Sequence, residues 1–142
     1  MQSEAHFLEL IDSHFAREHD FLALGRGDDC AVLRGGTDYC VTSDLFLEGE
    51  HFRLDYFSAA DIGYKALAVN VSDIAAMGAK PVAFTMDLMA PANLPDEFWN
   101  EFFKSMAGLA RQNDMVLAGG DLSRSERLGV SISAFGAPGS TG

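Results

Sequence analysis

The stretch Asp61–Pro81, DIGYKALAVNVSDIAAMGAKP, decides how the rest of this chain is arranged. Its apolar residues recur at the three- and four-residue spacing of one helix face, which predicts an amphipathic helix. The pattern stops at Gly78 and Pro81, two residues that commonly end a helix. The apolar stripe consists of Ile62, Ala66, Val69, Ile74 and Met77.

Asp73 does not fit a plain amphipathic helix. It lies among Val69, Ala76 and Met77 near the C-terminal end, where the helix dipole disfavours an anion and apolar neighbours make desolvation costly. Asn70, one turn earlier, offers a second oxygen on the same face. We therefore interpret Asp73 as a cation ligand; the alternative is an exposed aspartate, or one hydrogen-bonded to a loop.

Composition narrows the class of protein. The 142 residues suit a single domain with a real core, and 48% of them are hydrophobic. Acidic residues outnumber basic ones 21 to 10, and a net charge of -11 argues against a general nucleic-acid surface. Such a chain can still bind phosphates if metal ions lie between the negative charges.

The termini and cysteines point to the cytoplasm. The N-terminus, MQSEAHFLELIDSHF, is acidic and amphipathic, unlike a signal or transit peptide, and no apolar run reaches the roughly 18 residues of a membrane span. Cys30 and Cys40 are interpreted as reduced thiols, with a disulfide between adjacent strands as the alternative.

The remaining periodicity predicts an α+β fold, a two-layer mixed β-sheet with helices packed on one face. We expect further helices at 3–18 and 96–112, the second with its aromatic stripe in the core, and strands at 30–33, 39–43, 81–89, 115–118 and 128–135. Residues 1–142 are interpreted as one domain. The tail GAPGSTG suggests that the natural chain continues into a second one.

Four acidic clusters are predicted at the ends of these elements. They are Asp28 with Asp29; Thr42, Ser43 and Asp44; Asp73; and Asp121 after Gly119 and Gly120. Carboxylate and hydroxyl oxygens are ligands that Mg²⁺ prefers, and the clusters would repel one another without cations. If the fold gathers them, we expect more than one Mg²⁺ with phosphate oxygens completing the coordination. An ordinary turn is the alternative for GDD and GGD.

Other polar residues suggest how phosphates are bound. Gly119 and Gly120 allow close backbone approach to a phosphate, and Arg124 is expected to contact a phosphate or a partner carboxylate. His51 follows an acidic cluster closely enough to contact a ligand, or it packs against Phe52. Neither a Walker A loop, a GxSxG elbow nor a protein-kinase motif set is present, so no covalent catalysis is expected.

Four motifs in this order and spacing resemble the N-terminal domain of the thiamine-monophosphate kinase family, which belongs to the aminoimidazole ribonucleotide synthetase-like superfamily. They are GRGDDCAVL, VTSDLFLEGEHF, DIGYKALAVNVSDIAAMGAKP and AGGDLSR, and the likeness covers residues 3–136. The resemblance implies transfer of the ATP γ-phosphoryl group to thiamine monophosphate, and a homodimer formed through the β-sheet.

The resemblance also implies roles for individual residues. Gly120 and Asp121 would lie at the ATP phosphates, and His51 would contact thiamine monophosphate. The implied Mg²⁺ ligands are Asp29, Thr42, Ser43, Asp44, Asp73 and Asp121.

Two departures from the family pattern matter. Leu122 follows GGD where the family usually has a hydroxyl, which weakens the case for a nucleotide contact there. The family's C-terminal domain is absent, so we expect no kinase turnover from this chain alone.

Two alternatives remain open. One is another ATP-dependent enzyme of the superfamily, of the cyclo-ligase, selenophosphate synthetase or hydrogenase-maturation dehydratase type. The other is a non-catalytic acidic module that dimerises or binds cations.

Overall fold

The computed structural model describes residues 3–26, 32–34 and 38–138. Three helices and six strands follow one another in these residues. In chain order they are α1 (Glu4–His14), β1 (Leu22–Leu24), β2 (Val32–Leu33), β3 (Cys40–Leu47), α2 (Ala59–Ala76), β4 (Ala79–Ala90), α3 (Asp96–Gln112), β5 (Val116–Arg124) and β6 (Gly129–Pro138).

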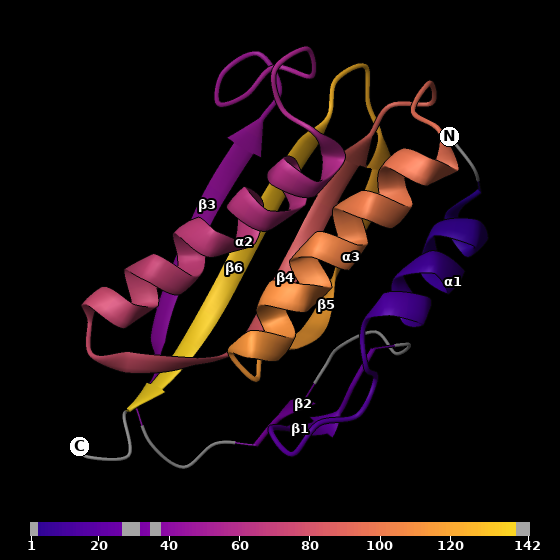
Figure 1. The fold of residues 1–142 in the computed structure, drawn as a ribbon. Coiled ribbons are helices and arrows are strands. Elements are labelled where there is room, and N and C mark those ends of the chain that lie inside the picture. The colour runs from indigo at the N-terminus through magenta and orange to yellow at the C-terminus, as the bar shows by residue number, and fades with distance from the viewer. Residues whose placement is uncertain (1–2, 27–31, 35–37, 139–142) are drawn as a thin grey trace.

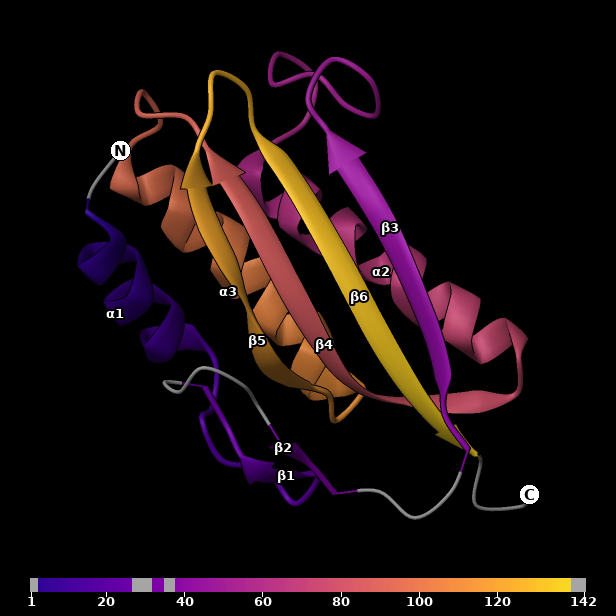
Figure 2. The same cartoon turned by 180° about the vertical axis from the view of Figure 1, so that it is seen from behind.

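Four of the strands form one mixed sheet in the order β3-β6-β4-β5. β4 and β5 run parallel, whereas β6 is antiparallel to both of its neighbours. Helices α2 and α3 cover one face of this sheet, and α1 lies beside α3 (Figure 1). Figure 2 shows the opposite face, which neither α2 nor α3 covers. The predicted two-layer α+β architecture is confirmed.

The core fills the space between the sheet and the helices, as burial of one apolar face on each element requires. The predicted aromatic stripe of α3 is part of it, because Phe102 and Met106 are fully buried. Trp99 of α3 also makes an edge-to-face contact with Phe7 of α1, with ring centroids 5.2 Å apart. A smaller apolar cluster on the far side of the sheet packs against β1 and β2; its buried members are Leu22, Ala83, Val116 and Ala118.

Helix α2 begins at a reciprocal cap. The hydroxyl of Ser58 accepts from the backbone N–H of Asp61, and the Asp61 carboxylate accepts from the N–H of Ser58. The Lys65 ammonium, a candidate partner for Asp61 by spacing, lies instead 4.6 Å from the ring centroid of Phe57. The cap fixes where α2 starts and therefore where Asp73, four turns later, meets the sheet.

Several predicted boundaries were wrong. β5 was expected to end before GGD, but it continues through Gly119–Asp121, which pair with Thr85–Asp87 of β4. β3 likewise continues past Ser43 to Leu47. α1 is shorter than the predicted 3–18, and β1 was not predicted. Pairing with a neighbouring strand extends a strand beyond its apolar run, and a single sequence does not reveal that pairing.

No helix in the described part of the chain combines the length and the apolar content needed to cross a membrane. Cys40 is a half-buried free thiol on β3. Cys30 lies outside the described residues.

Candidate functional site: an acidic pair and a glycine-lined cleft

Asp44 and Asp73 meet at the margin of the layer between β3 and α2, where Asp44 is partly buried and Asp73 is exposed, as the alternative interpretation of Asp73 allowed. Asp44 lies in the middle of β3, and strand alternation turns its side chain toward the face that α2 covers. Asp73 comes from the last turns of α2 and lies within hydrogen-bonding reach of the Asp44 carboxyl group. Two acids far apart in the sequence thus form one pair, which we call the acidic pair.

The electrostatics of the acidic pair are unfavourable without a counter-charge. Burial raises the pKa of Asp44 above its ordinary value of 3.8, and a hydrogen bond with Asp73 and the negative charge of Asp73 raise it further. Oδ2 of Asp44 is buried and has no hydrogen-bond partner among the described residues. An acceptor oxygen held in this way is suited to a cation or a strong donor.

The three residues of the TSD motif lie on both sides of β3. Thr42 is two positions before Asp44 and shares its face. Ser43 is on the opposite face, where its Oγ is 3.1 Å from Oγ of Ser133 in β6. The structure therefore brings Thr42, but not Ser43, to the side of the sheet on which the acidic pair lies.

Gly120 and Asp121 lie at the other edge of the sheet. The register forms one row across the strands, from Asp44 through Ile132 and Met86 to Gly120. Three strand spacings separate the ends of this row, about 14 Å. Within one chain, the structure does not bring Asp121 next to the acidic pair.

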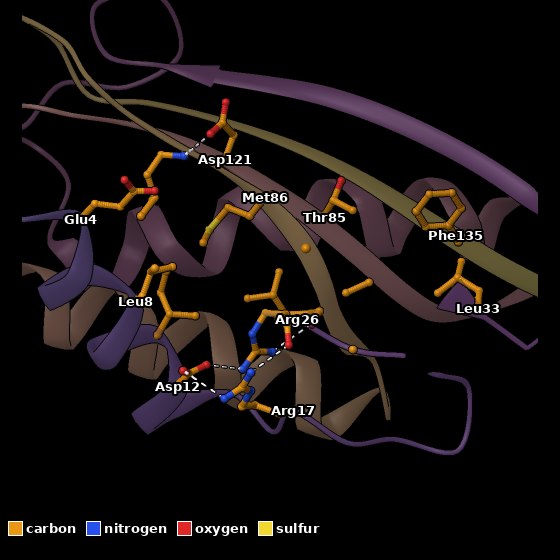
Figure 3. Close-up of a pocket in the computed structure, with 17 residues that line it drawn as sticks. Glu4, Leu8, Asp12, Arg17, Arg26, Leu33, Thr85, Met86, Asp121 and Phe135 are labelled. Atoms are coloured by element: carbon orange, nitrogen blue, oxygen red, sulfur yellow. Dashed lines mark hydrogen bonds and ion pairs between the residues drawn. The ribbon is translucent and has the colours of Figure 1, made fainter. Parts of the chain in front are cut away.

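A cleft of about 700 Å³ opens at the β5 edge, between that strand, α1 and the short β1–β2 ribbon (Figure 3). Its lining combines apolar side chains with charged groups. The charged residues that line it are Glu4, Asp12, Arg17, Arg26 and Asp121, and its glycines are Gly25, Gly119 and Gly120.

The two glycines of GGD have different reasons to be glycine. A Cβ on Gly120, whose φ is 155°, would overlap the backbone carbonyl of Met86, so close packing of β5 against β4 requires glycine there. A Cβ on Gly119 would meet no described atom within 4 Å. Gly119, rather than Gly120, therefore leaves room beside the cleft.

Arg26 holds one wall of the cleft together. Its guanidinium donates to the backbone oxygens of Phe15, Ala16 and Leu117 at 2.8–3.0 Å, and to the Asp12 carboxylate at 3.0 Å. Figure 3 shows Arg26 directed toward Asp12. Its side chain is only 12% exposed. Sequence analysis missed this residue, because its acceptors are mostly backbone groups that side-chain patterns do not reveal.

The remaining predicted site residues are scattered. His51 follows β3; its Nδ1 accepts from the N–H of Leu47, and its ring stacks on Phe46 at a centroid distance of 6.0 Å. Arg124 is exposed at the end of β5, beyond the residues that line the cleft. Asp28 and Asp29 lie outside the described residues.

The donor set at the acidic pair fits a hard divalent cation. Carboxylate oxygens from Asp44 and Asp73 are the ligand type that Mg²⁺ takes, and the buried Oδ2 of Asp44 lacks another described partner. Among the described residues, no group of three or more His, Cys, Asp or Glu side chains is arranged to hold a metal ion. A cation here would therefore need further oxygens from neutral groups, water or a ligand.

Comparison with known proteins identifies the family. The model of "AIR synthase related protein, N-terminal domain" matches residues 27–137. The chain belongs to this family. The solved structure of thiamine-monophosphate kinase from Stenotrophomonas maltophilia is 38% identical to this chain, with a TM-score of 0.78, and the match covers 94% of this chain and 42% of the other. Escherichia coli HypE, a hydrogenase maturation protein, has the same fold at 22% identity and a TM-score of 0.78, over 96% of this chain and 43% of the other.

Curated relatives of this chain include thiamine-monophosphate kinases. That of Bacillus subtilis is 39% identical over 121 residues, which are 83% of this chain and 37% of the relative. That of Escherichia coli K12 is 45% identical over 104 residues, 71% of this chain and 31% of the relative. The chain thus spans about a third of the length of these kinases.

Proposed function

We propose that this chain is the N-terminal domain of an ATP-dependent thiamine-monophosphate kinase whose C-terminal domain lies outside residues 1–142. The reaction moves the γ-phosphoryl group of ATP to the phosphate of thiamine monophosphate and yields thiamine diphosphate and ADP. Thiamine-monophosphate kinases that are 35–45% identical to this chain support the proposal. A related structure, AaThiL complexed with AMPPCP and TMP, is 26% identical to this chain with a TM-score of 0.65.

The contact between Asp44 and Asp73 is the observation that carries the proposal. Transfer between two anionic phosphates needs positioning and neutralisation of charge more than a protein nucleophile. Bound Mg²⁺ ions would supply that neutralisation. The residues proposed to hold them are Thr42, Asp44 and Asp73 at the acidic pair, Asp121 at the β5 edge, and Asp29; the Ser43 side chain is no longer in this set, because it faces Ser133 on the opposite side of the sheet.

The β5 edge is proposed as the nucleotide side of the site. Gly120 and Asp121 would lie at the ATP phosphates, with Arg124 contacting a phosphate or a partner carboxylate, and the space beside Gly119 supports this assignment. His51 is proposed to contact thiamine monophosphate. Its Nδ1 is occupied by the Leu47 N–H, so Nε2 is the ring atom for that contact.

The test is thiamine diphosphate formation by the full-length protein with ATP, Mg²⁺ and thiamine monophosphate. We expect Asp44→Asn, Asp73→Asn and Asp121→Asn each to lower kcat/KM by about 100-fold or more, the scale of losing one charge-stabilising group. Asp20→Asn, an exposed acid in the loop before β1, is the control and should leave kcat/KM unchanged. Full activity of Asp73→Asn would refute the assignment, and turnover by residues 1–142 alone would refute the need for a second domain.

Substrate choice separates the alternatives. If aminoimidazole precursors or selenide, rather than thiamine monophosphate, support ATP consumption, the chain belongs to another enzyme type of the superfamily. If ATP does not strengthen Mg²⁺ binding in a calorimetric titration, the chain is a cation-binding module without kinase function.

We further propose a cytoplasmic homodimer that forms through the β-sheet. The sheet face left open by α2 and α3 supports a second copy there, and it carries Val41 and Leu45, which are 63% and 57% exposed. The proposed protein is cytoplasmic and binds neither nucleic acid nor membrane; the net charge of -11 supports the absence of a nucleic-acid surface.

A further inference from the structure

Asn70 is a buried polar residue that the fold itself does not explain. It is the one polar side chain among the buried residues that the structure describes, with 0% exposure. Its Nδ2 donates to the backbone oxygen of Ala66 at 3.2 Å. Its Oδ1 is buried and has no partner among the described residues. Leaving such an oxygen unpaired destabilises the folded state, because the hydrogen bonds it makes to water are lost and not replaced.

The position of Asn70 connects this oxygen with the acidic pair. Asn70 and Asp73 are three residues apart on α2 and therefore neighbours on its surface. Asn70 belongs to the buried side of the helix, whereas Asp73 is exposed and reaches Asp44 from the edge of the helix–sheet layer. Two buried acceptor oxygens without described partners, Oδ1 of Asn70 and Oδ2 of Asp44, thus lie beneath the same helix.

We propose that Asn70 supplies a neutral oxygen to the divalent cation held by Asp44 and Asp73. The inference rests on the cation site of the proposed function and adds a ligand to it. Two carboxylates neutralise a divalent cation, so a further donor adds coordination without adding repulsion when it is uncharged. The bond from Nδ2 to Ala66 fixes the orientation of the amide and leaves Oδ1 as the available atom.

The test compares Mg²⁺ binding, measured by isothermal titration calorimetry, in the full-length protein and its variants. We expect Asn70→Leu to fold, because it removes an unpaired polar atom and keeps the volume, and to weaken Mg²⁺ binding at least about tenfold. Asn113→Leu is the matched control, since its Nδ2 makes the same bond to a carbonyl four residues earlier, that of Leu109 at 3.0 Å. It should leave the Mg²⁺ affinity unchanged. A folded Asn70→Leu protein with wild-type affinity would overturn the proposal.

Asn70→Asp keeps the test decisive if the leucine variant does not fold. A ligand role predicts that Mg²⁺ raises the melting temperature of Asn70→Asp by more than it raises that of the wild type, because binding stabilises the folded state in proportion to affinity. A purely structural amide predicts equal Mg²⁺-dependent rises and would refute the proposal. If the wild type binds Mg²⁺ but forms no thiamine diphosphate, the kinase proposal fails while the role of Asn70 stands.

Discussion

At the scale of single residues, the partly buried Asp44 of β3 and the exposed Asp73 of α2 lie against each other. The raised pKa of Asp44 means that the folded chain binds a proton there more tightly than the unfolded chain does. The stabilisation that comes from protonating Asp44 in the folded chain is therefore fully present below pH 3.8 and is lost as the pH rises through the raised pKa. At neutral pH the pair destabilises the metal-free fold, which is the expected cost of a site prepared for a cation.

Replacing one acid of the pair should remove the destabilisation of the metal-free fold. Without divalent cations, we expect Asp73→Asn to raise the melting temperature at pH 7 by roughly 2–4 °C, and to raise it less at pH 3, where Asp44 is largely protonated. Thermal unfolding followed by circular dichroism at both pH values measures the difference. Asp20→Asn serves as the control, and an equal effect of Asp73→Asn at the two pH values would contradict the origin we assign to it.

The two glycines of the GGD motif have different roles: Gly120 is needed for packing, and Gly119 leaves space at the proposed nucleotide site. Gly120→Ala should destabilise the fold by about 3 kcal/mol or more, since its Cβ overlaps the Met86 carbonyl and its φ of 155° is unfavourable for a side chain. Gly119→Ala should change the free energy of unfolding by less than about 1 kcal/mol but weaken nucleotide binding by the full-length protein. Urea unfolding and nucleotide titration distinguish the two. Unchanged nucleotide affinity in Gly119→Ala would exclude the β5 edge as the phosphate side.

Sequence reasoning reached some of these residues and missed others for physical reasons. Asp73 stood out because an acid near the end of an apolar helix is costly to bury; the structure leaves it exposed and brings it to a second acid, Asp44, so its role as a cation ligand stays a prediction. Ser43 was grouped with Asp44, yet strand alternation turns it to the other face. Arg26 escaped notice because most of its partners are carbonyl oxygens, those of Phe15 and Ala16 just after α1 and that of Leu117 on β5.

At the scale of elements, the close contact between α2 and α3 determines the position of α2 on the sheet. Gly63 of α2 lies so close to the backbone of Phe102 that a Cβ would overlap its carbonyl oxygen. Ser105 of α3 also donates from Oγ to the backbone oxygen of Ala60 at 2.7 Å. The two helices therefore pack backbone against backbone near the start of α2, which directs its far end, with Asp73, over β3.

A pair of glycine substitutions tests this packing. Gly63→Ala should lower the free energy of unfolding by about 1–3 kcal/mol, because the helices must separate to accommodate the methyl group. Gly108→Ala, on α3, has only the Arg111 guanidinium at 4.0 Å and should raise it by up to about 1 kcal/mol. Chemical denaturation measures both. If the two substitutions have the same sign, the close crossing does not constrain α2.

Periodicity predicted the helices better than it predicted strand lengths. The spacing of apolar residues fixed 96–112 as a helix, and α3 has these bounds. β5 was predicted to stop at Ala118, because glycine and aspartate are poor strand formers. Hydrogen bonding to β4 carries the strand on to Arg124, so the GGD motif is not the turn that its composition suggests.

At the scale of the whole molecule, the two faces of the sheet differ. One is buried under helices, whereas the other carries exposed apolar side chains beside serines such as Ser43 and Ser133. The α+β layering followed from the alternation of helical and strand patterns along the chain. The sequence did not indicate what covers the open face, because a single sequence gives no measure of contacts between copies.

The proposed homodimer gives a direct test of that face. Leu45→Lys should weaken dimerisation, because it would bury a charge in the interface. Met77→Lys should not, because Met77 is exposed at the end of α2, the helix that covers the opposite face of the sheet. Analytical ultracentrifugation over a concentration series reports the association. A wild-type chain that stays monomeric at high concentration would exclude the dimer, and equal dimerisation of the two variants would exclude this face.

The pairing of β3 has a consequence for biosynthesis. β3 forms its sheet contacts with β6 alone among the described strands, joining Leu47 to Gly129 and Cys40 to Gly136. On the ribosome, the segment containing Val41 and Leu45 emerges long before its partner has been translated. During that interval it is an unpaired strand able to associate with other nascent chains. A stop codon before residue 129 would therefore leave a polypeptide prone to aggregation rather than a smaller stable domain.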